Sequence, residues 1–287
     1  TINCSAGYCQ RGINYNANGT LVLDNVKVGG QGVTYALNFP GMSDNAQVTI
    51  NNCEATGCIA LNLWGENMVI NVNNSILTSV DTASHENYSA VNLNNDGEMM
   101  ANGTVVNIKG GKVIARDENG DPSYAVKNSS LTGNVIIDET TEVVGKIAQN
   151  VAIVYFDGAN EFYGSVSLAA AVETYFENAN ASGIRLLRNI ELEETLVIPA
   201  GRPVVLDLNG KTLSGNWHKD NGAIIKNEGT LTVVNGTISS LANNGGSAIL
   251  NYGTLTLNDV EINGAPIVDG GWPSYAINNY GNLTVNS

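Results

Sequence analysis

The sequence has few positively charged residues and no long hydrophobic run. Its 287 residues include 13 Lys and Arg against 27 Asp and Glu, which gives a formal net charge of −14. Nucleic-acid-binding proteins neutralise phosphates with clustered Lys and Arg, and anionic membrane surfaces attract the same residues. No apolar stretch is long enough to cross a bilayer. We therefore expect neither a nucleic-acid partner nor insertion into a membrane.

Proline is also scarce, whereas glycine is abundant and asparagine recurs along the whole chain. The sequence contains 6 Pro and 32 Gly. Gly and Asn are the residues that most readily adopt the positive φ of a tight turn. This composition therefore predicts many turns of one kind, built from residues that tolerate a left-handed backbone.

The strongest pattern is a repeat that has an Ala, then an aliphatic residue, and a Gly five positions after the Ala. The second half of the repeat is a Gly followed by a Thr-aliphatic-x-aliphatic segment. The first half begins at Ala36, Ala60, Ala248 and Ala276, and the second half begins at Gly19, Gly103, Gly229 and Gly253. Alternation with period two, interrupted every few residues by Asn or Gly, predicts short strands with one buried face.

Stacking of these repeats predicts an all-β fold, a right-handed single-stranded parallel β-helix or solenoid. Successive anchors at Ala36, Ala60, Ala90 and Ala125 are 24 to 35 residues apart, and the extra length falls before the next Ala. One corner of each coil should therefore carry a variable loop. The residues expected to point into the core are Leu21, Leu61, Ile249, Leu255 and Ile277.

Asparagine recurs at the turn that follows the Ala strand. The positions are Asn38, Asn62, Asn92, Asn227, Asn251 and Asn278. We interpret them as turn residues that form a hydrogen-bonded ladder in some repeats.

The repeat fails between Lys146 and Arg188, and this break divides the chain into two modules. Residues 165–177 have an apolar face and predict a short helix, capped by Ser165 or Ser167, that covers the open end of the second module. We expect a first β-helix module of about five coils over residues 1–147. Residues 148–287 should hold the capping helix and a second module that stops within a coil.

The second half of the chain resembles a known family. The stretch LRNIELEETLVIPAG, then LDLNGKTLSG and the repeats with (A/I)I-x-N-x-G-T-L-T are similar to the pectate-lyase-like β-helix regions of large bacterial surface proteins and adhesins. The match covers about residues 160–287 and extends more loosely to the first half. The resemblance implies an extracellular or cell-surface location and a binding role, and it transfers no catalytic residue.

The four cysteines form two pairs with the same spacing, Cys4 with Cys9 and Cys53 with Cys58, and each pair follows a Thr-Ile-Asn segment. The two pairs should lie at one corner and two coils apart, which is too far for a relaxed disulfide between them. The prediction is two local disulfides in an oxidising compartment. Four free buried thiols, or a zinc site made by both pairs, are the alternatives.

No cofactor is expected apart from a possible calcium ion. Asp117, Asn119 and Asp121 have alternating oxygen ligands, as a calcium loop does, but the segment lacks the Gly and the distal Glu of an EF-hand. Solvated loop residues are the alternative.

Candidate ligand-binding residues are the aromatic side chains of turns and loops. Trp64, Trp217 and Trp272 lie in such segments, the last two beside His218 and Tyr275. Their rings could stack on a sugar, and the alternative is that they cover the loop ends of the core.

The chemistry of the sequence favours binding over catalysis. It shows no clustered carboxylate pair, no basic residue beside one and no nucleophile with a His next to it, and Asp207 is best explained as a turn residue. We expect an adhesin, ligand-binding protein or scaffold that contacts a glycan, a surface protein, neighbouring domains or copies stacked end to end. A polysaccharide lyase or glycoside hydrolase is the alternative, because catalytic groups on adjacent coils are invisible in linear spacing.

Overall fold

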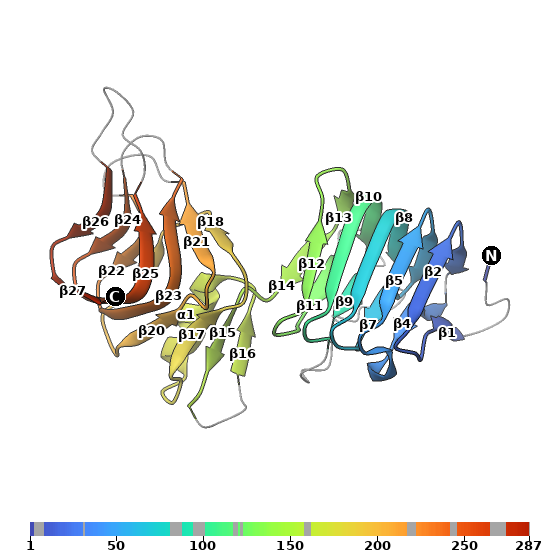
Figure 1. Cartoon of the computed structure of the whole chain (residues 1–287), viewed down its shortest axis with the longest axis horizontal. Coiled ribbons are helices and arrows are strands. Elements are labelled where there is room, and N and C mark those ends of the chain that lie inside the picture. The colour runs from blue at the N-terminus through green and yellow to red at the C-terminus, as the bar shows by residue number, and fades with distance from the viewer. Residues whose placement is uncertain are drawn as a thin grey trace. The chain divides into compact units, whose positions relative to one another are not determined.

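The computed structural model describes residues 1–2, 9–30, 32–80, 88–93, 101–116, 120, 123–157, 162–216, 222–241, 246–264 and 274–286. The chain divides into two compact units, Thr1–Gln149 and Asn150–Ser287 (Figure 1). The sequence places this boundary two residues earlier, between 147 and 148.

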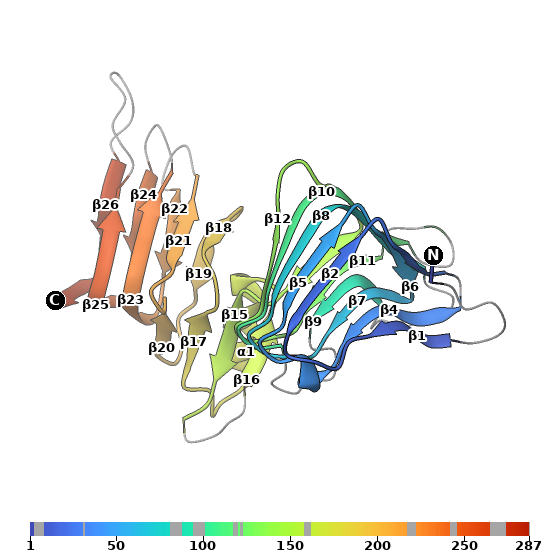
Figure 2. The same cartoon turned by 45° about the vertical axis from the view of Figure 1, so that its right-hand side comes forward.

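In the first unit, every pairing between described strands is parallel, and neighbours in a sheet come from successive repeats (Figure 2). One sheet has the order β1 (Cys9–Asn14), β4 (Val33–Phe39), β7 (Ile59–Leu63), β9 (Ser89–Leu93), β11 (Tyr124–Asn128) and β14 (Lys146–Gln149). The other has the order β12 (Asn134–Ile137), β10 (Val105–Arg116), β8 (Val69–Val80), β5 (Gln47–Asn51) and β2 (Thr20–Asp24), with β3 (Lys27–Gly29), β6 (Glu54–Gly57) and β13 (Glu142–Val144) beside it. A 3-10 turn, η1 (Gly41–Ser43), follows β4.

One corner of the first unit is built from a column of residues with positive φ. Asn25 lies between β2 and β3 and Asn52 between β5 and β6, with φ of 55° and 52°. The long strands β8 and β10 bend at the equivalent positions, Asn74 and Gly110, where φ is 46° and 66°. Asn and Gly adopt this left-handed conformation more easily than other residues. The prediction that Gly and Asn form the turns is confirmed at this corner.

The core consists of columns of aliphatic side chains. Val48, Ile70 and Val106 occupy equivalent positions on β5, β8 and β10, and each is at most 1% exposed. A fully buried aliphatic side chain stabilises the fold by roughly 1.5–3 kcal/mol. Among the residues predicted to point inward, three are fully buried and two pack partly buried against a core. These are Leu61, Ile249 and Leu255, and Leu21 and Ile277, respectively.

The second unit continues the parallel pattern after an antiparallel start. Its larger sheet contains β16 (Phe162–Ser165), β15 (Ala152–Tyr155), β17 (Gly183–Leu186), β20 (Val204–Asp207), β23 (Thr230–Ser240), β21 (Thr212–Gly215) and β18 (Ile190–Leu192), with β25 (Thr254–Asn263) and β27 (Asn282–Asn286) paired beyond β23. The smaller sheet has the order β19 (Leu196–Ile198), β22 (Ala223–Asn227), β24 (Gly246–Asn251) and β26 (Ser274–Asn279). Strand β15 pairs antiparallel with both β16 and β17. The sequence did not predict this hairpin.

The predicted helix is present and shorter than expected. Helix α1 spans Leu168–Glu177, and the side chain of Ser167 accepts a hydrogen bond from the Ala170 N–H at 3.1 Å. Ser165 belongs to β16, because the hairpin with β15 already uses its backbone, and Val166 and Ser167 lie between that strand and the helix. The apolar face predicted for residues 165–177 is wrong at Val166 and Ala169, since these two apolar side chains are exposed. The helix contacts β15, β16, β17 and β19.

Arg202 holds the C-terminal end of α1. Its guanidinium lies 3.7 Å from the centre of the Tyr175 ring and donates to the carbonyl oxygens of Asn178, Ala179 and Ala181. The last carbonyls of a helix lack intrahelical donors and carry partial negative charge, so a cation there is favourable. This contact fixes where the helix ends.

The described part of the chain is therefore all-β with parallel sheets, compatible with a β-helix-like fold. It contains no helix that is both long and apolar enough to cross a bilayer.

The predicted disulfide between Cys53 and Cys58 is wrong, because the two residues are buried without a bond between their sulfur atoms. Strand β6 lies between them and is extended. At about 3.3 Å per residue, it separates the two Cα atoms far beyond the roughly 5.5 Å of a disulfide. Cys4 lies outside the described residues, so its bond to Cys9 stays a prediction.

We expect the end of the first unit to lose stability at low pH through Asp138. Its carboxylate accepts hydrogen bonds from the Gly110 N–H at 3.1 Å and from the hydroxyls of Thr141 and Thr140, each at 2.8 Å. The Gly110 N–H and then the Thr141 hydroxyl lower the pKa of Asp138 below its usual value. Because the pKa of Asp138 is lower in the folded than in the unfolded chain, its carboxylate stabilises the fold fully at a pH above the unfolded-state pKa. This stabilisation is lost as the pH falls through the folded-state pKa.

Hydrogen exchange of the β12 amides, measured between pH 7 and pH 2.5 and corrected for intrinsic exchange, checks this prediction. Protection should decrease in the acidic range in the native chain and change less with pH in Asp138→Asn. Glu139→Gln is the matched control, since this exposed neighbour makes no such contacts among the described residues. Equal pH profiles for the native chain and Asp138→Asn would contradict the prediction.

Candidate functional site

A ladder of asparagines, buried except for Asn14 at its end, runs across the first sheet of the first unit. The amide of Asn38 donates to Asn14 at 2.6 Å, Asn62 donates to Asn38 at 2.7 Å, and Asn92 donates to Asn62 at 2.8 Å. These residues are paired in register on β1, β4, β7 and β9. Each step of the ladder therefore pairs one amide donor with one amide acceptor, which buried polar groups need when they are removed from water.

A second ladder in the other unit corrects one predicted position. Asn227 donates to Asn251 at 2.7 Å, and Asn251 donates to Asn279 at 2.6 Å. The sequence analysis placed Asn278 in this column. The register pairs Asn278 with Leu250, so the neighbouring Asn279 is the ladder residue.

The residues that follow the first ladder alternate between the core and the surface. Phe39 and Leu63 end β4 and β7 with their side chains fully buried. Successive side chains of a strand point to opposite faces, so the next residues, Pro40 and Trp64, are directed outward and are partly exposed. The backbone N–H of Trp64 donates to the Phe39 carbonyl at 2.8 Å, which fixes the backbone at this point.

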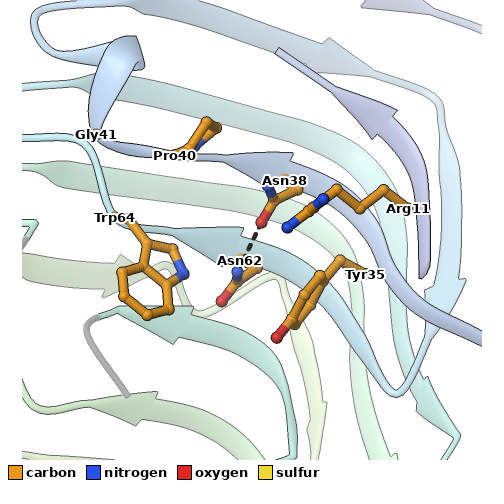
Figure 3. A pocket seen from close by; sticks show the side chains of 7 residues that line it. All are labelled: Arg11, Tyr35, Asn38, Pro40, Gly41, Asn62 and Trp64. Carbon is orange, nitrogen blue, oxygen red and sulfur yellow. Dashed lines mark hydrogen bonds between the residues drawn. The ribbon is translucent and has the colours of Figure 1, made fainter. Parts of the chain in front are cut away.

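A shallow groove of about 240 Å³ lies beside this ladder. Arg11 on β1 pairs in register with Tyr35 on β4, and its guanidinium carbon is 6.0 Å from the centre of the Tyr35 ring. Figure 3 shows that the side chains of Arg11, Tyr35 and Trp64 gather around the Asn38–Asn62 hydrogen bond. The lining residues are Arg11, Tyr35, Asn38, Pro40, Gly41, Asn62 and Trp64.

The groove combines aromatic rings, amides and a single charge, which is positive. Arg11 is the charged lining residue, and no carboxylate lines the groove among the described residues. Guanidinium groups bind carboxylates through paired N–H donors, and aromatic side chains offer apolar area with polar edges. The volume is below the range of drug-sized pockets and suits a single ring of a ligand.

Of the two predicted ligand-binding residues that the structure describes, one lies in this groove. Trp64 lines it, whereas Tyr275 belongs to the second unit, on β26, and is 47% exposed. Trp217, His218 and Trp272 lie outside the described residues.

The predicted calcium ligands Asp117, Asn119 and Asp121 also lie outside the described residues, so that site stays a prediction. Within the part of the chain that the structure describes, no three His, Cys, Asp or Glu side chains come together as a metal site would require.

Sequence reasoning missed Arg11 and Tyr35 as site residues. Arg11 was considered only for catalysis, for which it lacks paired acidic residues nearby, and no prediction named Tyr35. The available signal was the distance of each residue from its ladder asparagine. Each lies three residues before one, Asn14 for Arg11 and Asn38 for Tyr35.

Asp207, the carboxylate with the most motif-like surroundings, has a structural role. It is 8% exposed and accepts from Arg185 Nε at 2.8 Å and from the Asn209 N–H at 2.9 Å. Arg185 also lies 5.0 Å from the ring centre of Tyr155, and burial raises the pKa of that phenol. These contacts hold the turn after β20, as expected for a turn residue.

Comparison of the chain with protein-family models, with curated proteins and with solved structures finds no match. The family resemblance noted in the sequence therefore stays an expectation, and the proposed function rests on the residues of the groove.

Proposed function

We propose that each unit is a right-handed single-stranded parallel β-helix and that the first unit binds an acidic saccharide in the groove of Arg11, Tyr35 and Trp64. The protein acts outside the cell or at its surface, as an adhesin or glycan-binding module. It holds its ligand without chemical turnover.

The β-helix proposal is supported by the strand pairing. Strands that neighbour each other in space belong to successive repeats and run parallel, as in β2, β5, β8 and β10. Connections between parallel strands of one sheet are right-handed in about 98% of cases. The pectate-lyase-like resemblance of residues 160–287 agrees with this architecture.

The observation that carries the binding proposal is the composition of the groove. Trp64 and Tyr35 offer rings on which a pyranose can pack, and Arg11 supplies the donors for a carboxylate. The net charge of −14 repels anions at long range. At physiological salt this repulsion is screened within about 8 Å. Binding of an anion in the groove therefore depends on the nearby guanidinium of Arg11. A uronic acid unit of a polysaccharide fits these requirements.

We expect Arg11→Gln to weaken binding of oligogalacturonides by about tenfold or more. A hydrogen bond to a charged group contributes roughly 1.5–3 kcal/mol, and 1.4 kcal/mol is a factor of ten. Trp64→Ala should weaken both acidic and neutral oligosaccharides. Isothermal titration calorimetry of the full chain with oligogalacturonides, and with uncharged oligosaccharides of equal length, measures both effects.

Two matched controls locate the site. Arg116→Gln removes another exposed arginine of the same unit, and Trp272→Ala removes a tryptophan of the other unit. Neither should change the affinity. If Arg116→Gln weakens binding as much as Arg11→Gln does, the effect comes from net charge alone. If only Trp272→Ala weakens binding, the saccharide binds at the loop of Trp272. Steady release of unsaturated or reducing ends would support the enzyme alternative instead.

A further inference from the structure

A second groove lies in the second unit, between α1 and the strands β18 and β19. It consists of two adjoining hollows of about 510 and 440 Å³, both lined by Ala169, Thr195 and Leu196. Much of the lining is apolar. Val166 and Val197 contribute to it while being 57% and 43% exposed, so apolar surface here faces water.

Two strand edges border this groove. Strand β18 pairs with β21 alone and β19 with β22 alone among the described strands, so each is the edge of its sheet. Ile190 and Leu192 of β18 and Leu196 of β19 line the hollows. The N–H and C=O groups along an unpaired edge are a template for one more strand.

The polar lining of this groove is negative. Glu191, Glu193, Glu194 and Glu173 contribute to it, and no Lys, Arg or His does so among the described residues. None of these carboxylates forms an ion pair with a residue that the structure describes. Like charges brought together oppose binding, so an acidic partner is disfavoured and a basic one is favoured.

We propose that this groove docks an extended segment of a partner protein in which apolar residues alternate with Lys or Arg. The segment adds as a strand to the free edge of β18. Along β18 itself, Ile190 and Leu192 are more buried than Glu191, which is exposed. A paired strand has the same period of two, so its apolar side chains meet Ile190 and Leu192 while its basic side chains meet Glu191.

Fluorescence anisotropy of the full chain with a labelled seven-residue peptide of alternating Lys and Val tests this proposal. We expect saturable binding that becomes at least tenfold weaker in the triple variant Glu191→Gln, Glu193→Gln, Glu194→Gln. Hydrogen exchange should show slower exchange of the β18 amides when the peptide is bound. Circular dichroism establishes that the variant is folded, which surface Glu to Gln changes should preserve.

The matched control is the triple variant Glu66→Gln, Glu139→Gln, Glu261→Gln, which changes the net charge by the same amount at other places. It should bind the peptide as the native chain does. The proposal is overturned if no saturable binding occurs, if both triple variants weaken it equally, or if protection appears away from β18. Because the groove of Arg11 lies in the other unit, these results are independent of saccharide binding.

Discussion

Replacing Gly253 by Ala is expected to destabilise the second unit by about 3 kcal/mol or more. A Cβ atom at this position would lie 1.9 Å from the carbonyl oxygen of Gly229 in the preceding repeat. The next repeat has the same arrangement, because a Cβ at Gly281 would lie 2.0 Å from the Gly253 oxygen. Insertion into a packed interior costs typically 1–3 kcal/mol, and more where backbone must move.

The reason is the close approach of repeats and not the backbone conformation, since φ of Gly253 is not positive. Urea unfolding of the full chain, followed by hydrogen exchange of β24 and β25, measures the loss. Gly41→Ala is the control, because a Cβ there meets nothing within 4 Å and φ is also not positive. Equal shifts of the unfolding midpoint from the native value, each measured in the variant's own unit, would contradict this prediction.

The sequence predicted the parts of the fold that recur. The Gly anchors at Gly229, Gly253 and Gly281 are a column in which consecutive repeats approach closely, and this is why the spacing does not drift. The aliphatic columns follow from the period-two pattern, because each repeat must place its apolar face toward the same core. Parallel pairing follows from the equal order of strands in every repeat.

The parts that do not recur were missed or misplaced. The hairpin of β15 and β16 has no second copy among the described strands, so self-similarity gave no signal for it. The two Thr-Ile-Asn segments were treated as equivalent. The structure pairs Ile2 with Val28 on β3, whereas Ile50 pairs with Leu23 on β2, so the segments occupy different strands of their repeats. Identical letters therefore did not imply identical positions.

The groove of the first unit could not be predicted because it depends on register. Arg11, Tyr35 and Trp64 are 24 and 29 positions apart in sequence, and they lie on β1, on β4 and directly after β7. They meet only when β1, β4 and β7 are aligned by their ladder asparagines. A shift of one residue would turn each side chain to the other face of the sheet. Composition and motif spacing do not contain this information.

We expect Asn62→Leu to destabilise the first unit by about 3 kcal/mol. Asn62 is 1% exposed, donates to Asn38 Oδ1 at 2.7 Å and accepts from Asn92 Nδ2 at 2.8 Å. Leucine has a similar volume but no polar atom, so both neighbours, Asn38 at 4% and Asn92 at 0% exposed, lose a hydrogen-bond partner. Each orphaned buried group costs about 1–3 kcal/mol. The Oδ1 atom of Asn92 already lacks a partner, so that side chain would be left with no hydrogen bond from the ladder.

Urea unfolding, followed by hydrogen exchange of β7 and β9, measures this effect separately from ligand binding. Asn14→Ala is the matched control at the end of the same ladder. Asn14 is exposed, so water can replace it as the acceptor for Asn38, and the loss should be about 1 kcal/mol or less. Equal losses in the two variants would mean that the ladder stabilises through contacts at its surface. A much larger loss for Asn62→Leu would show that the buried amides hold the repeats in register.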